Sequence, residues 1–394
     1  RRRALYIIID RRGKYMQIVL DQEKLKILQD KSKLLSYLNT AFTKTYFSIG
    51  DGKFILFFKG VKGAAKFVIP IEKATEKACV FQIDYSKWLN ALAKFNIFTN
   101  AIYVTLTEKS LTLKAAGGMT GVISLGIIPY DSDSPEVDVL NNFIESNWKE
   151  DKKITINEDI VDAISISLSV LTPASKNNAI ALTQNSVLYA DRSIVLKSFC
   201  SIPPLPADCP VEMHRYSAGF ILQAWKQNPE FFFSSDFSTI NWKSSDGMLS
   251  CILAGEPCEI VIPTEEEIQA IKPKGNASIT IEDHRDLVHA LELFNGFYEA
   301  SVWKPIKFTL TKNKGLQLEY KHPTIEIQKD LEVPVSEDGD FILSSENLSK
   351  LLDKASEKNN WEGVPVVFQY DEESLGVSCS IGAYFDVIFA KLST

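Results

Sequence analysis

A pattern of strand, helix, strands, helix and strands occurs three times along this chain, with a period close to 130 residues. A strand-like segment leads directly into an amphipathic helix at Asp21, at Asn157 and at Glu282. These junctions are 136 and 125 residues apart. Since a domain usually holds roughly 100–200 residues, each copy is long enough to fold as one domain. The 394 residues therefore predict three similar α+β domains.

A second helix recurs inside each unit, beginning near Tyr85, Tyr216 and Ser344, and a short strand-like segment precedes it each time. After each helix the sequence predicts a strand, a polar turn and another strand. Residues 107–109 and 371–373 are examples of such turns between β-branched and aromatic segments. A serine stands near the start of each helix, and we expect its hydroxyl to cap the helix N-terminus.

The predicted domains are residues 1–147, 148–274 and 275–394, each with two helices and seven or more strands. The first 14 residues or so are expected to be an extension that precedes the first unit. Linkers are expected at residues 130–137 and 271–276, because both stretches are polar and contain proline.

The net charge of −7 argues mildly against nucleic-acid binding, but its distribution along the chain is uneven. Residues 1–147 carry 21 basic and 14 acidic side chains, residues 148–274 carry 11 and 16, and residues 275–394 carry 11 and 20. A chain graded from basic to acidic could associate head to tail with a second copy of itself.

Several of the predicted helices set an apolar stripe against a polar stripe that contains lysines. A single stripe of this kind is usually a solvated face. Its repetition over several helices of one acidic chain favours a surface that follows a phosphate backbone without reading bases. The candidate DNA-binding residues are Lys26, Lys33, Lys87, Lys94, Lys226, Lys350 and Lys354.

The sequence contains no constellation that indicates catalysis. It has neither a G-x-x-x-x-G-K-[ST] phosphate loop nor a G-x-S-x-G nucleophile elbow, and the glycine-rich residues 117–121 are interpreted as a hairpin turn. His284 and His289 do not share a helix face, so no metal site is predicted. We therefore expect no enzymatic activity and no cofactor. Trp242, Trp303 and Trp361 are expected to pack on sheets.

The six cysteines form no C-x-x-C pair and are expected to be reduced thiols in the core. No run approaches the roughly 18 apolar residues that a membrane span needs, and no signal peptide is recognised. These features predict a cytoplasmic protein without a membrane partner.

The third unit resembles the bacterial-type DNA polymerase sliding clamp, the beta subunit, in residues 276–294, 338–355 and 383–392. The second unit resembles the middle domain of that family over residues 178–188. It also does so at Ala190-Asp191-Arg192, where the Gly-His of the family's turn is absent. The resemblance covers about residues 15–392, and its divergence suggests a distant or phage-encoded member.

The resemblance implies a DNA clamp fold with three clamp-type domains, in which pairs of helices pack on antiparallel sheets. It also implies a head-to-tail homodimer that encircles duplex DNA regardless of base sequence. Such a protein acts as a processivity factor: a clamp loader opens the ring, and a DNA polymerase binds it. The protein would then act in the cytoplasm of a bacterial cell, or of an infected host if phage-encoded. The charge gradient suits contact between the first unit of one chain and the third unit of the other.

The family also implies a pocket for a partner peptide between the second and third domains. The residues carried over to it are Asp191, Arg192, Val195, Ile271, Val387, Ile388, Phe389 and Leu392. Alternatively, the last of these belong only to the core of a strand. Two other functions stay open from the sequence: a phage structural or receptor-binding protein built from repeated α+β modules, and a monomeric processivity factor that forms no ring.

Overall fold

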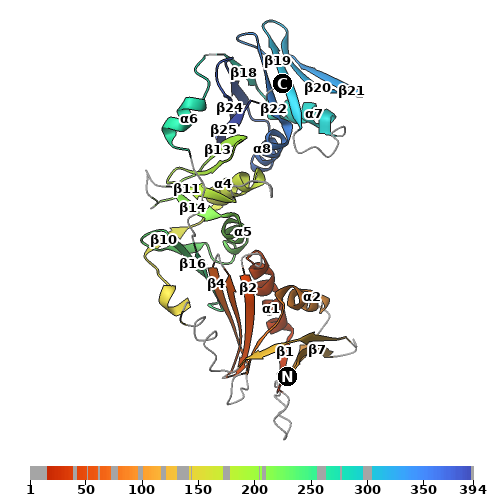
Figure 1. Ribbon diagram of the computed structural model, residues 1–394, viewed down its shortest axis with the longest axis vertical. Helices are drawn as coiled ribbons and strands as arrows, with labels where there is room; N and C mark the ends of the chain where they lie inside the picture. Colours follow the sequence, from red (N-terminus) through yellow and green to blue (C-terminus); the bar gives the residue numbers. More distant parts are fainter. Residues whose placement is uncertain are drawn as a thin grey trace. The chain divides into compact units, whose positions relative to one another are not determined.

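The structure is a computed structural model in which the chain forms two compact units (Figure 1). One unit comprises Arg1–Ile156 and Gly219–Glu256, and the other comprises Asn157–Ala218 and Pro257–Thr394. The residues that the structure describes are 16–38, 42–50, 52–60, 63–71, 79–95, 101–116, 121–130, 142, 144–171, 178–203, 205, 210–254, 263–275, 277–295 and 304–391.

The first unit contains two antiparallel sheets and the helices α1 (Gln22–Ser36) and α2 (Tyr85–Lys94). The four-stranded sheet has the order β1 (Met16–Asp21), β6 (Ala101–Leu106), β7 (Ser110–Ala116) and β8 (Val122–Gly126). The nine-stranded sheet has the order β10 (Lys152–Thr155), β15 (Glu230–Phe233), β16 (Thr239–Lys243), β17 (Leu249–Ala254), β4 (Gly63–Pro70), β3 (Lys53–Gly60), β2 (Phe42–Gly50), β5 (Cys79–Gln82) and β9 (Ile128–Tyr130).

Aromatic side chains fill the space between the helices and the nine-stranded sheet. The fully buried Trp88 of α2 stands edge-on to Phe47, with 5.0 Å between ring centroids, and stacks on Phe54. Helices α1 and α2 contact each other, and the Gln29 side chain donates to the Leu92 carbonyl at 2.9 Å. Apolar burial therefore holds the two helices against the sheet, and polar contacts hold the helices to each other.

The second unit also contains two antiparallel sheets. The eight-stranded sheet has the order β14 (Val211–His214), β11 (Ala179–Leu182), β12 (Ser186–Ala190), β13 (Ile194–Phe199), β25 (Phe385–Ala390), β24 (Gly376–Ile381), β23 (Val366–Gln369) and β18 (Ser278–Ile281). The four-stranded sheet has the order β21 (Ile325–Leu331), β20 (Gly315–His322), β19 (Pro305–Thr311) and β22 (Gly339–Ser344).

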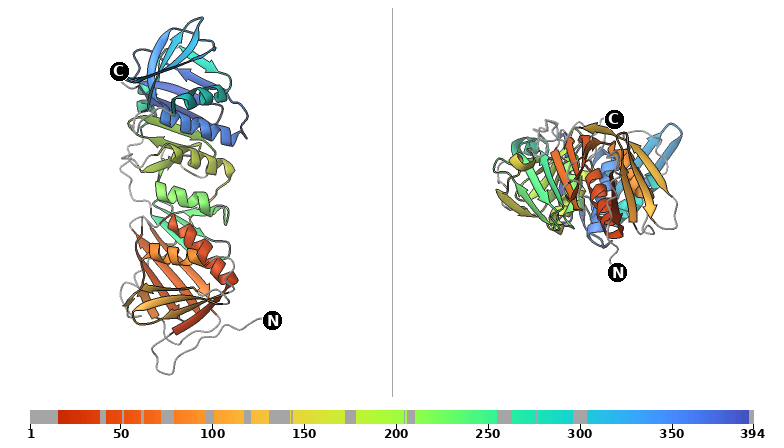
Figure 2. Two further views of the ribbon diagram at one scale, coloured as in Figure 1. Left: turned by 90° about the vertical axis from the view of Figure 1, so that its right-hand side faces the viewer. Right: turned by 90° about the horizontal axis from the view of Figure 1, so that it is seen from below.

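Helices of the second unit are α4 (Glu158–Ser169), α6 (Glu265–Ile271), α7 (His284–Asn295) and α8 (Ser345–Lys358). Helix α8 contacts both α7 and α4, and Figure 2 shows α4 and α8 running side by side. Helix α5 (Arg215–Ala224) spans the residues where one unit gives way to the other along the chain.

Strands from different sequence repeats pair edge to edge inside each unit. In the first unit β17 pairs with β4, and in the second unit β13 pairs with β25. At the first of these junctions a Cβ on Gly63 would lie 2.3 Å from the Ile252 carbonyl oxygen, so only glycine allows this close approach. The α+β class and the helices packed on antiparallel sheets are thus confirmed, whereas the division into three domains stays a prediction.

The prediction that serines cap the second helix of each repeat is wrong. At α2 the cap is Asp84, which accepts from the Lys87 backbone N–H at 3.0 Å, and the Ser86 hydroxyl donates to the same carboxylate. At α5 the Tyr216 N–H donates to His214 Nδ1, and Ser344, the N-cap residue that precedes α8, makes no side-chain cap bond. At each of the first two helices, a residue two or three positions before the expected serine already accepts from a backbone N–H of the first turn.

The tryptophan prediction is half right. Trp242 is fully buried on β16, but Trp361 is 63% exposed, in a turn after α8 where Asn360 and Trp361 both have positive φ. Trp303 lies outside the described residues.

Four cysteines in the described part of the chain are thiols outside any disulfide: Cys79, Cys200, Cys251 and Cys379. Cys251 and Cys379 are buried, and burial raises the pKa of the half-buried Cys200 thiol to about 12. Cys209 and Cys258 lie outside the described residues. Among described residues no three His, Cys, Asp or Glu side chains gather as metal ligands would, and no helix is long and apolar enough to cross a membrane.

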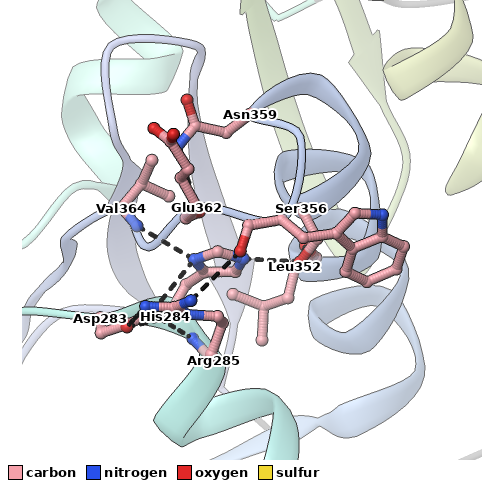
Figure 3. A network of polar contacts seen from close by, with 9 residues as sticks. Asp283, His284, Arg285, Leu352, Ser356, Asn359, Glu362 and Val364 are labelled. Carbon is pink, nitrogen blue, oxygen red and sulfur yellow. Dashed lines mark hydrogen bonds and ion pairs between the residues drawn. The ribbon is translucent and has the colours of Figure 1, made fainter.

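A buried histidine joins α7, α8 and the segment before β23 (Figure 3). The Val364 N–H donates to His284 Nδ1 at 3.1 Å, which leaves Nε2 as the protonated nitrogen, 2.6 Å from Ser356 Oγ. Ser356 Oγ in turn donates to the Leu352 carbonyl at 3.1 Å. Burial lowers the pKa of His284, although the nearby Asp283 carboxylate opposes this. The network therefore requires a neutral imidazole.

We predict that His284 makes the protein sensitive to mild acid. Below the unfolded pKa of roughly 6.5, the unfolded chain binds a proton that the native chain does not. Stability is therefore complete above that pH and falls, by at most about 1.4 kcal/mol per pH unit, towards the lowered native pKa. Urea unfolding at pH 7.5 and 5.5 measures this loss. His284→Asn keeps an acceptor for the Val364 N–H and should lose less stability between the two pH values than the wild type; an equal loss would contradict the assignment.

Candidate functional site

The first helix pair presents four of the predicted DNA-binding lysines on its exposed side. Lys26 and Lys33 are exposed on α1, and Lys87 and Lys94 are exposed on α2. Within each helix the two lysines are seven residues apart, which is two turns or about 10 Å along one face. None of the four forms an ion pair with another described residue.

One lysine of α1 points the other way and was not singled out from the sequence. Lys31 Nζ lies 3.1 Å from Asp246 Oδ2 and donates to Gln227 Oε1 at 2.7 Å, and only 8% of its side chain is exposed. The Gln29 side chain of α1 is also engaged, since it donates to the carbonyls of Leu92 and Phe95 near the end of α2. The helical period alone places a side chain on a face; it does not show which polar groups find partners there.

The predicted lysines of the third repeat are half-buried and engaged in ion pairs. Lys350 Nζ lies 2.8 Å from Glu346 Oε1, one turn earlier on α8, and Lys354 pairs with Glu357. The neighbouring Lys358 reaches Asp162 at 3.4 Å and Asp159 at 3.9 Å, both on α4. Lys226 is exposed in the turn after α5 and lies over the Trp225 ring, 5.9 Å from its centroid.

The predicted peptide-binding residues gather where β13 pairs with β25. Val195 stands directly opposite Ile388, and Ile194 stands opposite Phe389. Because side chains alternate between the two faces of a strand, Val195 and Ile388 share one face and Ile194 and Phe389 share the other.

The face that carries Ile194 and Phe389 belongs to the core beneath α4. Leu196 and Val387 are also paired there, and both are fully buried, as are Ile194 and Phe389 to within 2%. Val387 and Phe389 therefore support the sheet from inside. Val195 and Ile388 lie on the opposite, outer face, where Val195 is half-buried and Ile388 is buried at 5% exposure. Leu392 lies outside the described residues.

Asp191 shapes the turn that precedes β13. Its carboxylate accepts from the Ser193 and Ile194 backbone N–H groups at 2.7 and 3.1 Å, and from the Tyr189 hydroxyl at 2.8 Å. With these three donors the Asp191 side chain holds the loop, while the neighbouring Arg192 is exposed.

Ile271 is brought to the same outer face by contacts that the sequence did not reveal. A Cβ on Gly376 would lie 2.6 Å from Ile388 Cγ2 and 2.9 Å from the Ile271 carbonyl oxygen, so Gly376 lies close to both the Ile388 side chain and the Ile271 backbone. The segment following Ile271 is tied down by Asp371, whose Oδ2 accepts from the Lys274 and Gly275 N–H groups at 2.5 and 3.1 Å.

Asp371 is itself held by Ser374. The Ser374 hydroxyl donates to the Asp371 carboxylate, and this bond, followed by the backbone N–H donors, keeps the pKa of Asp371 far below its usual range. Residues 371–373 were interpreted only as a polar turn. The aspartate at position 371 and the serine three residues later are typical of an anchored turn, so the sequence did contain an indication of this loop.

We predict that Asp371→Ala loosens the segment after α6. Its removal leaves several backbone N–H groups without their acceptor, so unfolding in urea should show a loss of about 1–3 kcal/mol. Tryptic cleavage after Lys274 should be faster than in the wild type. Glu372→Ala, an exposed neighbour in the same turn, is the matched control, and equal cleavage rates for the two variants would refute the anchoring role.

No protein-family model matches the sequence, and no curated protein matches it either. Solved structures do match. The DNA polymerase III beta subunit of Thermotoga maritima is 11% identical with a TM-score of 0.72, covering 96% of this chain and 99% of that one. The beta subunit of Pseudomonas aeruginosa is 10% identical with a TM-score of 0.69, covering 96% and 100%. The Helicobacter pylori beta clamp, bound to a DNA ligase peptide, is 15% identical with a TM-score of 0.68, covering 96% and 100%.

The resemblance expected from the sequence is thus confirmed in three dimensions, over nearly the whole of both chains. Over that length, this chain has the fold of the bacterial DNA polymerase III beta sliding clamps.

Proposed function

We propose that this protein is a sliding clamp: a ring that encloses duplex DNA and tethers a DNA polymerase, with no chemistry of its own. The observation that carries the proposal is the similarity to beta clamps along nearly the entire chain, since a match to a single module would be compatible with many functions. The decisive test is topological. The loaded protein should stay on closed circular DNA and slide off the same DNA after linearisation; equal loss from both would reject the ring.

Head-to-tail assembly is supported by where the exposed apolar side chains lie. Among the described residues, those that are large, apolar and exposed all fall in residues 1–147 or 275–394, and none falls between. They are Tyr37, Val122, Ile128, Leu293, Trp361 and Leu375. Together with the excess of basic residues in the first repeat and of acidic residues in the third, this pattern supports contact between those two repeats of different chains.

Within the second unit, Leu293 is the best candidate for this contact. Arg285, near the start of α7, donates to the Trp361 carbonyl just after the end of α8, and that end of α8 reaches α4 through Lys358. Leu293 therefore lies towards the opposite end of α7, eight residues and about 12 Å from Arg285, and its side chain is 48% exposed. In the first unit, Val122 is 60% exposed on β8, an edge strand whose outer backbone groups can pair with another chain.

We predict that Leu293→Glu and Val122→Glu each convert a dimer into a monomer at micromolar concentration, because a charge would be buried in an apolar contact. Sedimentation velocity measures the change. Trp361→Glu is the control, an equally exposed apolar residue near the α4 end of α8, and it should leave the dimer intact. A wild-type protein that sediments as a monomer would favour the processivity factor without a ring.

Partner binding is proposed at the outer face formed by Val195, Ile388 and Ile271. The Helicobacter pylori beta clamp was solved with a DNA ligase peptide bound to it, and this supports a peptide-binding site in this fold. We propose that a short apolar segment of the polymerase, and one of the clamp loader, bind here in turn. The side chains of Val387 and Phe389 would act only as support from within.

We predict that Val195→Glu weakens binding of the cognate polymerase at least tenfold while the dimer persists. Val367 offers a matched control: it is also half-buried and lies on the same face of the sheet, but on β23, three strands away. Val367→Glu should leave polymerase binding within about twofold of wild type. Point substitution is preferable to truncation at residue 388, since truncation would remove half of β25 from the interior of the sheet. Equal effects of the two substitutions would place the site elsewhere.

A further inference from the structure

The helix pairs of the three repeats carry very different charges. Helices α1 and α2 contain six lysines and two carboxylates. Helices α4 and α5 contain one arginine and three carboxylates, and α7 and α8 contain four basic and five acidic side chains. Only the helix pair of the first repeat is therefore strongly positive.

The helix pairs also differ in how many of their lysines form ion pairs. On α1 and α2, Lys31 is the one lysine paired with a described carboxylate, and it faces inward. On α8, each of Lys350, Lys354 and Lys358 is paired. A surface ion pair is weak, roughly 0–1 kcal/mol, so a phosphate could displace the carboxylate. The displaced carboxylate would nevertheless stay close by and repel the phosphate.

One acidic side chain on α8 lies close to two others. The pKa of Asp353 is raised, first by partial burial and then by the neighbouring carboxylates Glu357 and Glu292. These three acidic side chains lie on adjacent parts of α8 and α7, where a phosphate would have to approach Lys354.

We propose that, of the helix pairs of the first and third repeats, only the first holds duplex DNA, through Lys26, Lys33, Lys87 and Lys94, and that Lys350 and Lys354 contribute nothing to DNA binding. This inference rests on the proposed clamp function and changes the set of lysines expected from the sequence. Two exposed lysines on each of two adjacent helices, about 10 Å apart along each helix, suit successive contacts with the phosphates of a duplex. The partner is defined by charge alone, so base sequence has no influence on it.

The test compares pairs of substitutions in the full-length protein. Binding of a fluorescent 30-base-pair duplex is measured by anisotropy at salt concentrations from about 25 to about 200 mM. In this range the release of counterions dominates the affinity. The variants are Lys26→Gln with Lys33→Gln, Lys87→Gln with Lys94→Gln, and Lys350→Gln with Lys354→Gln. Each removes two positive charges from a helix surface, and circular dichroism verifies folding.

Either variant of the first repeat should reduce the slope of log affinity against log salt by about 2, since each phosphate contact contributes about 0.9. The α8 variant should leave slope and affinity unchanged. As a converse measurement, Asp353→Asn with Glu357→Gln should raise affinity several-fold. An α8 lysine variant with a slope reduced as much as that of the others would overturn the proposal. A wild-type protein with no salt-dependent duplex binding would instead overturn the clamp function.

Discussion

Antiparallel pairing between strands of successive repeats is the interaction on which the rest of this structure depends. A sheet edge with unpaired N–H and C=O groups is a liability, and the pairings β17–β4 and β13–β25 remove four such edges. Gly63 permits the first pairing because any side chain at that position would collide with the Ile252 carbonyl. The register of the second decides which residues face outward, since a slip of one residue would exchange the two faces.

That register also explains the limits of the sequence analysis. The helices and most strands follow from local periodicity, and the structure confirms them. The second half of strand β25, however, is apolar on both faces: Val387 and Phe389 are buried beneath α4, and Ile388 is buried on the opposite face. Such a strand shows no alternation in sequence, so the outer position of Ile388 follows only from its partner Val195.

Short polar side chains make the local choices that hydrophobic periodicity leaves open. Asp84 caps α2 where a serine was expected, Asp191 closes the turn before β13, and Asp371 anchors the segment after α6. Each is a carboxylate that accepts several N–H or O–H groups, and for Asp84 and Asp371 the lowered pKa reflects these bonds. A sequence contains many aspartates in polar stretches, and only the positions of the donors distinguish an anchor from a solvated side chain.

The same reasoning applies to charge. An acidic chain can hold an acidic polymer because ionic attraction is screened over about 8–10 Å at physiological salt, so a phosphate responds to its immediate surroundings rather than to the net charge of −7. Counting lysines on helix faces therefore overestimates the binding surface. Lys350 and Lys354 satisfy the periodic pattern as well as Lys87 and Lys94 do, yet carboxylates on the same helix neutralise the former pair. In the proposed clamp, a lysine contributes to DNA binding when no carboxylate lies within reach of its ammonium group, and for this chain that condition selects the first helix pair over the third.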